Sequence, residues 1–196
     1  ICEKLNIPAV STGNMIREAM KNGTEMGKKA KSFVDAGNLV PDEVVIGIIK
    51  ERLAQEDCQK GFILDGFPRT LPQAEILESL LAEKGIKLTC VLEIQVPDEI
   101  IMERILGRYS CLKCGAGYHD KFQKPKVYGV CDVCGGTEFG RRKDDNRATV
   151  QNRLVNYRLL TYPTIPFFEK RGLLRTVDGT GTIDAVSHKI DEILEI

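Results

Sequence analysis

The sequence predicts an α/β protein in which helices flank a parallel sheet. Helical apolar patterns alternate along the chain with short apolar runs at 61–65, 89–96 and 173–177, and this alternation is typical of βαβ units. A glycine-rich block with two Cys-x-x-Cys pairs interrupts the alternation. We expect a core domain made of residues 1–10, 41–106 and 146–196, a helical insert at 11–40 and a cysteine insert at 107–145.

The composition indicates an ordinary globular protein and excludes several classes. The 196 residues carry 28 Lys and Arg against 28 Asp and Glu, so the formal net charge is zero. Nothing here favours a general nucleic-acid or membrane-surface binder, and any anion site must come from local clustering of arginines. There is no apolar stretch of the roughly 18 residues that a membrane span needs, and no signal peptide is visible.

The N-terminal third is expected to be helical but peripheral. Residues 1–5 resemble the last turns of an amphipathic helix. The helical insert is polar, rich in lysine and interrupted by glycines, so we expect short helices and loops outside the core. Pro41, Asp42 and Glu43 then indicate a helix start, with an apolar face that follows from Val44 to Leu53.

The stretch 61–73 is the most informative part of the chain. Its apolar run predicts a strand buried on both faces, with Asp65 at the carboxyl end, where open α/β sheets bind ligands. Arg69 lies on the following turn with a fork of donors that matches phosphate oxygens. Thr70 and Gln73 fit the N-cap and capping-box positions of the next helix. An acid, an arginine and a helix N-terminus around one point favour a metal–phosphate ligand.

Each of these residues also has a plainer interpretation. A strand that ends in Asp-Gly is often a simple turn. Arg69 taken alone fits a solvated surface charge, and Gln73 taken alone fits a helix cap. Their convergence within thirteen residues is what favours a site.

Four of the seven cysteines have the spacing of a tetrathiolate zinc site. The predicted ligands are Cys111, Cys114, Cys131 and Cys134. A disulfide or redox pair is the alternative, although one Cys-x-x-Cys would then suffice. Four protein ligands leave no open position, so we expect a structural zinc that holds together an insert poor in apolar residues. This pattern suits a reducing cytoplasm. The other cysteines are expected to be buried small hydrophobes: Cys2, Cys58 and Cys90.

Zinc ribbons often bind nucleic acid, and this insert carries basic and aromatic residues. They are Lys113, Lys121, Lys124, Lys126, Arg141, Arg142 and Lys143, with Tyr118, Phe122 and Tyr128. A nucleic-acid-binding module is therefore an alternative function, but it leaves Asp65 and Arg69 without a role.

Taken together, several stretches resemble the adenylate kinase family, in its bacterial type with a long zinc-bearing lid. The matching pieces are 11–17, 38–40, 65–70 with Gln73, Arg104 with 107–108, the cysteine insert, 142–145 and Arg153. They run in order along essentially the whole chain. The resemblance implies reversible phosphoryl transfer between ATP and AMP, giving two ADP, with Mg²⁺ as cofactor. Other nucleoside monophosphate kinases share this architecture and remain close alternatives.

The same resemblance implies roles for individual residues. The catalytic set would be Asp65, Arg69, Arg108, Arg142 and Arg153, with Asp65 acting on Mg²⁺ through water. AMP would be bound by Thr12, Arg17, Asn38, Leu39, Val40, Gly66, Phe67, Pro68, Arg69, Gln73, Arg142 and Arg153, with Gln73 at the adenine edge. ATP would be bound by Arg104, Arg108, Gly117, Tyr118 and Gly181. The helical insert would close over the monophosphate and the cysteine insert over the triphosphate, and both would be mobile.

One departure from the family pattern stands out. The glycine-rich phosphate loop, G-x-x-x-x-G-K-[ST], occurs nowhere in these residues. We therefore expect a P-loop-type core whose first strand and phosphate loop precede Ile1 in a longer protein, and a 196-residue chain that is inactive or unstable by itself. We expect a cytoplasmic monomer that binds ATP, AMP and ADP but neither nucleic acid nor membrane.

Overall fold

The structure is a computed structural model that describes all residues from 1 to 196. The α-helices are α1 (Cys2–Leu5), α2 (Thr12–Lys21), α3 (Glu25–Ala36), α4 (Asp42–Leu53), α5 (Leu71–Glu83), α6 (Asp98–Gly107), α7 (Arg147–Asn156), α8 (Thr164–Glu169) and α9 (Ile183–Leu194). The strands are β1 (Ala9–Ser11), β2 (Ile63–Asp65), β3 (Val91–Gln95), β4 (Arg108–Cys111), β5 (Gly117–His119), β6 (Phe139–Gly140) and β7 (Leu174–Asp178). A 3₁₀ turn, η1 (Glu56–Cys58), follows α4, and a π-helix, η2 (Tyr157–Thr161), follows α7.

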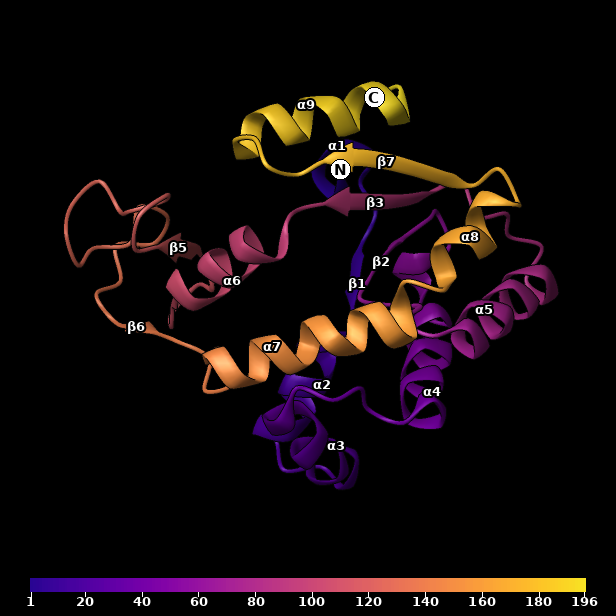
Figure 1. The fold of residues 1–196 in the computed structure, drawn as a ribbon, viewed down its shortest axis with the longest axis horizontal. Helices are drawn as coiled ribbons and strands as arrows, with labels where there is room; N and C mark the ends of the chain where they lie inside the picture. The colour runs from indigo at the N-terminus through magenta and orange to yellow at the C-terminus, as the bar shows by residue number, and fades with distance from the viewer.

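The α/β class with parallel strands is confirmed, but the parallel strands form two separate pairs. β1 pairs with β2, with Ser11 opposite Asp65, and β3 pairs with β7, with Val91 opposite Leu174. Figure 1 shows the β3–β7 pair beneath α9 and the β1–β2 pair nearer the middle of the molecule. No strand of these 196 residues lies between the pairs, so they do not join into one sheet.

The strand at 61–65 is shorter and less buried than its sequence predicts. It is regular only from Ile63 to Asp65, and its apolar residues are half-buried. The prediction of burial on both faces was wrong. An apolar run indicates that a strand is hydrophobic, but it does not indicate how many other elements cover the strand. β2 has a single strand neighbour, β1.

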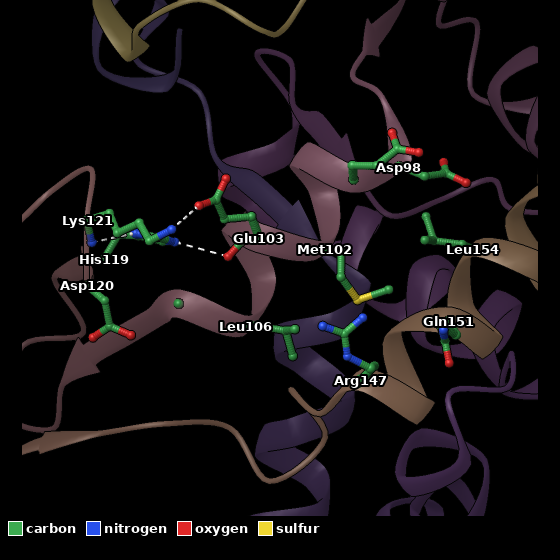
Figure 2. Close-up of a pocket in the computed structure, with 12 residues that line it drawn as sticks. Asp98, Met102, Glu103, Leu106, His119, Asp120, Lys121, Arg147, Gln151 and Leu154 are labelled. Carbon is green, nitrogen blue, oxygen red and sulfur yellow. Dashed lines mark hydrogen bonds and ion pairs between the residues drawn. The ribbon is translucent and has the colours of Figure 1, made fainter.

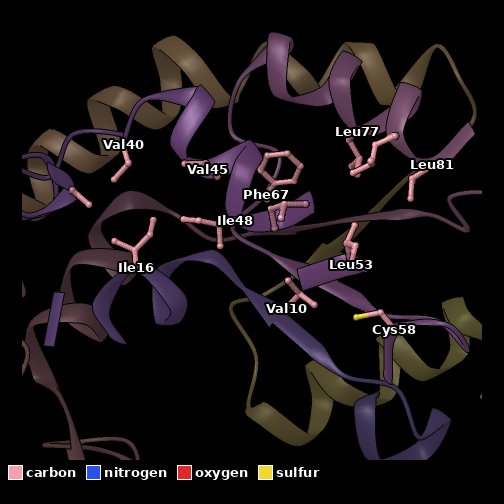
Figure 3. Close-up of a cluster of buried hydrophobic side chains, with 13 residues drawn as sticks. Val10, Ile16, Val40, Val45, Ile48, Leu53, Cys58, Phe67, Leu77 and Leu81 are labelled. Atoms are coloured by element: carbon pink, nitrogen blue, oxygen red, sulfur yellow. The ribbon is translucent and has the colours of Figure 1, made fainter. Parts of the chain in front are cut away.

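The main hydrophobic core joins the helical insert to α4 and α5. Ile16, Ala30 and Val40 from that insert are buried in one cluster with Ile49 and Leu77 (Figure 3). The expectation that residues 11–40 lie outside the core was wrong. α2 and α3 are regular helices of 10 and 12 residues, and most of their apolar side chains are buried in this cluster or packed against it.

The cysteine insert forms a small sheet of its own. β4 is its central strand and pairs antiparallel with β5 and β6, with Arg108 opposite His119 and Cys111 opposite Phe139. This sheet lies beyond the C-terminal end of α6, away from the core (Figure 1). Among the helices, none combines the length and apolar character that a membrane crossing requires.

Candidate functional site

The turn after β2 places Arg69 beside Asp65. The carbonyl oxygen of Gly66 accepts hydrogen bonds from Thr12 Oγ1 at 2.9 Å and from Arg69 Nε at 3.0 Å. Gly66 has φ +78°, and a Cβ there would lie 2.8 Å from Thr12 Oγ1, so only glycine fits this turn. Asp65 Oδ2 accepts a bond from Ser11 Oγ at 2.8 Å. The convergence predicted for this stretch is present in the structure.

A buried polar network fixes the start of α5. Thr70 is the N-cap, as predicted, because its Oγ1 accepts from the backbone N–H of Gln73 at 3.3 Å. The Gln73 side chain is only 2% exposed: its Oε1 accepts from the Arg69 N–H at 2.7 Å, and its Nε2 donates to Asp42 Oδ1 at 2.7 Å. A standard capping box would instead use the Thr70 N–H. Gln73 thus links α4 to the backbone of Arg69.

Five predicted site arginines from distant parts of the chain form one cluster. Arg17 comes from α2, Arg69 from the β2–α5 turn, Arg108 from β4, Arg142 from the segment before α7, and Arg153 from α7. Desolvation lowers the pKa of Arg17, and the nearby Arg142, Arg108 and Arg153 lower it further. The pKa of Arg142 is lowered for the same reasons. The guanidinium groups repel one another, and a bound anion would reduce this repulsion.

Arg69 connects this cluster to Asp65. Its guanidinium is solvent-accessible, yet the surrounding protein limits its hydration and lowers its pKa. Asp65 raises that pKa and Arg153 lowers it, so both lie within electrostatic reach of Arg69.

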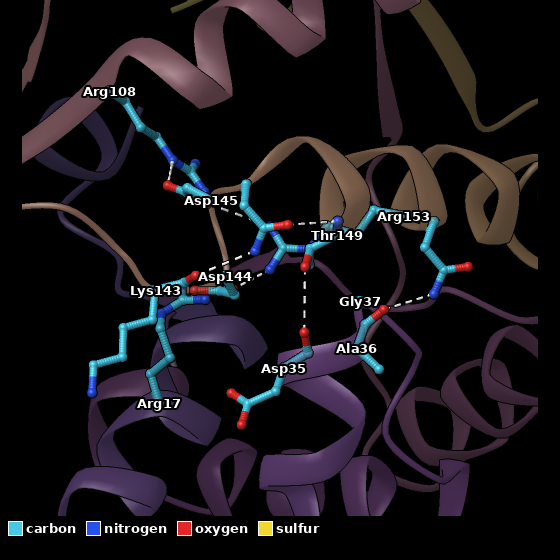
Figure 4. Close-up of polar contacts among 12 residues, drawn as sticks. Arg17, Asp35, Ala36, Gly37, Arg108, Lys143, Asp144, Asp145, Thr149 and Arg153 are labelled. Atoms are coloured by element: carbon cyan, nitrogen blue, oxygen red, sulfur yellow. Dashed lines mark hydrogen bonds and ion pairs between the residues drawn. The ribbon is translucent and has the colours of Figure 1, made fainter.

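Two adjacent aspartates hold the arginines in place. Arg108 makes a bidentate pair with Asp145, and this hydrogen bond raises the pKa of Arg108 (Figure 4). Arg153 pairs with Asp144 and lies 3.6 Å from Asp145. The two aspartate side chains are only 8% and 2% exposed. No role was predicted for Asp144 or Asp145, although an acid pair that begins two residues after Arg142, an arginine predicted to bind phosphate, could have indicated one.

The other residues predicted to bind AMP differ in burial. Phe67 and Val40 are buried, with side chains in the main core, so only their backbone would be available to a ligand. Thr12 is buried against the Gly66 turn. Asn38 is exposed, and Leu39 is half-buried.

Two residues predicted to bind ATP meet at the loop before α9. Arg104 of α6 donates to the carbonyl oxygens of Gly179 at 2.7 Å, Thr180 at 3.3 Å and Gly181 at 3.4 Å. Arg104 and Gly181 are therefore neighbours, as the prediction requires. The guanidinium of Arg104 is occupied by these hydrogen bonds, which hold the loop against α6.

The other two, Gly117 and Tyr118, lie on β5. Gly117 is exposed, whereas Tyr118 is 6% exposed and lies inside the cysteine insert. The Tyr118 hydroxyl donates to Cys131 Sγ at 3.3 Å and accepts from the Asp132 N–H at 2.7 Å. The Tyr118 hydroxyl is thus occupied by hydrogen bonds inside the insert, so only the backbone of Tyr118 is available for other contacts.

The four cysteine sulfurs of the insert lie within 4.8 Å of one another. Two of the pairs, Cys111 with Cys134 and Cys114 with Cys131, are 3.6 Å apart. Zinc–sulfur bonds of about 2.3 Å in a tetrahedron place sulfurs about 3.8 Å apart, so the arrangement fits zinc. The hydrogen bond from Tyr118 lowers the pKa of Cys131 to about 6, whereas hydrogen bonds with the neighbouring cysteines raise the pKa of Cys114 to about 12. Of the other cysteines, Cys58 is buried, while Cys2 and Cys90 are half-buried.

A separate cavity of about 680 Å³ lies between α6, α7 and the cysteine insert (Figure 2). Met102, Leu106 and Leu154 give it an apolar wall, and His119 and Glu103 border it. None of the predicted site residues lines it, so it is distinct from the arginine cluster.

Comparison with known proteins decides the family. The family model described as adenylate kinase matches residues 1–173. The chain belongs to the adenylate kinase family. It is 55% identical to an adenylate kinase of Paramagnetospirillum magneticum over 98% of this chain and 89% of that protein. It is 54% identical to one of Allorhizobium ampelinum over 99% and 90%, and 52% identical to one of Archaeoglobus fulgidus over 100% and 89%. Adenylate kinase membership favours the kinase over the nucleic-acid-binding alternative.

Proposed function

We propose that this protein catalyses reversible phosphoryl transfer between ATP and AMP, giving two ADP. The observation that carries the proposal is the arginine cluster in a chain of the adenylate kinase family. Five arginines converge from five separate places in the chain, and three aspartates, Asp65, Asp144 and Asp145, lie among them. Five positive charges against three negative charges leave a surplus of two, which suits a polyphosphate.

In the proposed reaction the chain positions two nucleotides and stabilises charge. An oxygen of the AMP phosphate bonds to the γ-phosphorus of ATP as the bond to the bridging β–γ oxygen breaks. No covalent enzyme intermediate is needed, so in-line positioning and cations around the transferring group supply the catalysis. Asp145 holds Arg108 in a bidentate geometry that phosphate oxygens reproduce, and Asp144 holds Arg153 through a single ion pair. Phosphates therefore replace Asp144 and Asp145 as partners when nucleotides bind.

The AMP site is proposed around the Gly66 turn and the end of the helical insert, with the residues given for it above. Gln73 is proposed to contact the adenine edge with the hydrogen-bonding capacity that its bonds to Arg69 and Asp42 leave free. The ATP site is proposed between Arg104, Arg108, the loop at Gly181, and Gly117 with Tyr118. Arg142 and Arg153 would contact phosphates at the junction of the two sites.

Two metals fit the residues present. Asp65 uses one carboxylate oxygen for Ser11, which leaves the other for a water of the Mg²⁺ that accompanies ATP. That Mg²⁺ would neutralise phosphate charge. The four-cysteine site is proposed to hold a structural Zn²⁺, because four protein ligands leave no position for substrate. Thiolate ligands also support a reducing, cytoplasmic location, and we propose that the protein acts as a monomer.

The test is a coupled assay of ADP formation on the complete gene product. With ATP as donor, we expect turnover with AMP at least a hundredfold more efficient, as kcat/KM, than with UMP, CMP or GMP. Preference for another monophosphate would assign a different nucleoside monophosphate kinase.

A further inference from the structure

Helix α7 holds the end of α3 through three side chains on one face. Thr149 Oγ1 donates to the carbonyl oxygen of Asp35 at 3.3 Å, as Figure 4 shows. Asn152 Nδ2 donates to the carbonyl oxygen of Ala36 at 2.7 Å, and Asn156 Nδ2 to that of Gly37 at 3.0 Å. The donors are spaced three and four residues apart, so they share one face of α7.

These three bonds complete the C-terminus of α3. Helix ends leave their last carbonyls without partners inside the helix. The N–H groups of Gly37 and Asn38 satisfy the carbonyls of Val34 and Phe33 at 3.0 and 2.8 Å. The next three carbonyls, Asp35 to Gly37, are those that α7 satisfies. We call Thr149, Asn152 and Asn156 the α7 clamp.

The α7 clamp also sets the orientation of Asn38. Its Oδ1 accepts from Asn152 Nδ2 at 2.8 Å and from Asn156 Nδ2 at 3.2 Å. Each clamp amide thus divides its two hydrogens between a carbonyl of the α3 end and Asn38. With Oδ1 held by both, the Asn38 amide has its Nδ2 group left to donate elsewhere.

Close packing keeps this contact specific. Gly37 has φ +74°, and a Cβ there would lie 2.6 Å from the Thr149 carbonyl oxygen and 3.3 Å from Arg153 Cγ. The backbone at the C-terminus of α3 therefore packs directly against α7, next to the aliphatic part of the Arg153 side chain. One helix carries both an arginine of the cluster and the clamp for the helical insert.

We propose that Thr149, Asn152 and Asn156 are positioning residues that seat the helical insert and orient Asn38, and so set the affinity for AMP but not for ATP. This rests on the proposed function. The hydrogen bonds of the clamp side chains reach only the end of α3 and Asn38, whereas the residues proposed for ATP alone lie on α6, β4, β5 and the loop before α9. Weakening the clamp therefore alters the AMP site and leaves the ATP site unchanged.

The test uses Asn152→Asp and Asn156→Asp in the complete gene product. Each change keeps the shape but replaces a donor with an acceptor that faces carbonyl oxygens. The matched control is Gln151→Glu, the same amide-to-acid change on the adjacent, exposed residue, which places the charge on the same helix without touching α3. Asn152→Ala and Asn156→Ala remove the same hydrogen-bond donors without adding a negative charge. The measurements are KM for AMP and for ATP, and the Kd of AMP by calorimetry.

We expect KM and Kd for AMP to rise on the order of tenfold in the clamp variants, with KM for ATP within about twofold of the unaltered protein. Amides at 36–40 should also exchange hydrogen faster. Equal rises for both nucleotides, no rise for AMP, or an equal rise in the Gln151→Glu control would overturn the proposal. An unaltered protein that binds AMP without making ADP would refute the proposed function alone, and the clamp would then be judged by Kd.

Discussion

Arg108 and Asp145 face each other at the junction between the cysteine insert and α7, joined by two parallel hydrogen bonds. Arg108 Nε lies 2.6 Å from Asp145 Oδ2, and Arg108 Nη2 lies 2.8 Å from Asp145 Oδ1. The carboxylate is almost completely enclosed. An arginine predicted to bind phosphate is thus already held in a geometry that phosphate shares. In the proposed reaction, a nucleotide phosphate would have to displace Asp145 to bind Arg108.

Replacing Asp145 tests that relationship. Asp145→Asn keeps the shape but removes the charge that balances Arg108 and Arg153, so we expect the free energy of unfolding to fall by about 1–3 kcal/mol. Pyrophosphate should restore more thermal stability to this variant than to the unaltered protein, because it supplies the missing charge. The control is Asp120→Asn, which removes an exposed pair with Arg141 and should change stability by less than about 1 kcal/mol. A variant that melts like the unaltered protein would contradict this account.

Arg69 is expected to be essential for turnover. Lysine cannot both bond the Gly66 carbonyl oxygen and present a fork to phosphate. We expect Arg69→Lys to lower kcat by about a hundredfold or more with little change in melting temperature. The control is Arg175→Lys on the exposed part of β7, which should retain full activity. Retention of more than half of kcat in Arg69→Lys would remove Arg69 from the catalytic set.

Gln73 is expected to matter for stability as well as for adenine recognition. Gln73→Leu keeps approximate volume but leaves the Arg69 N–H and Asp42 Oδ1 without their partner in a buried site. We expect the free energy of unfolding to fall by about 1–3 kcal/mol, measured in urea, and KM for AMP to rise. Gln151→Leu on the exposed face of α7 is the control and should cost less than about 0.5 kcal/mol. If the two variants unfold alike, the network contributes nothing to stability.

Zinc is expected to stabilise the cysteine insert and to take no part in the chemistry. Metal analysis should find one zinc per chain, lost in Cys114→Ser and kept in Cys90→Ser, which changes a cysteine outside the cluster. Chelation should lower the melting temperature while the initial rate at low temperature is unchanged. An immediate loss of rate with unchanged melting would indicate a catalytic ion instead.

Local chemistry made several features predictable. Thr70 caps α5 because a hydroxyl beside a helix start satisfies an orphan N–H wherever the helix lies. The four cysteines gather because two Cys-x-x-Cys turns each bring a pair of sulfurs together. The α/β class followed from the alternation of periodicities. Burial of β2 and of the helical insert was predicted wrongly, because both depend on which neighbours cover them.

By itself, the sequence determined the class of fold, the gathering of the four cysteines, and the chemistry of the turn after β2, since these depend mostly on contacts within a few residues. Tertiary structure alone decided that Arg17 and Arg153 meet, that Asp144 and Asp145 hold the arginines, and that α7 clamps the end of α3. Those partners are separated by up to 136 residues, as Arg17 and Arg153 are. No local pattern encodes such pairings, because they follow from how the helices pack over one shared core.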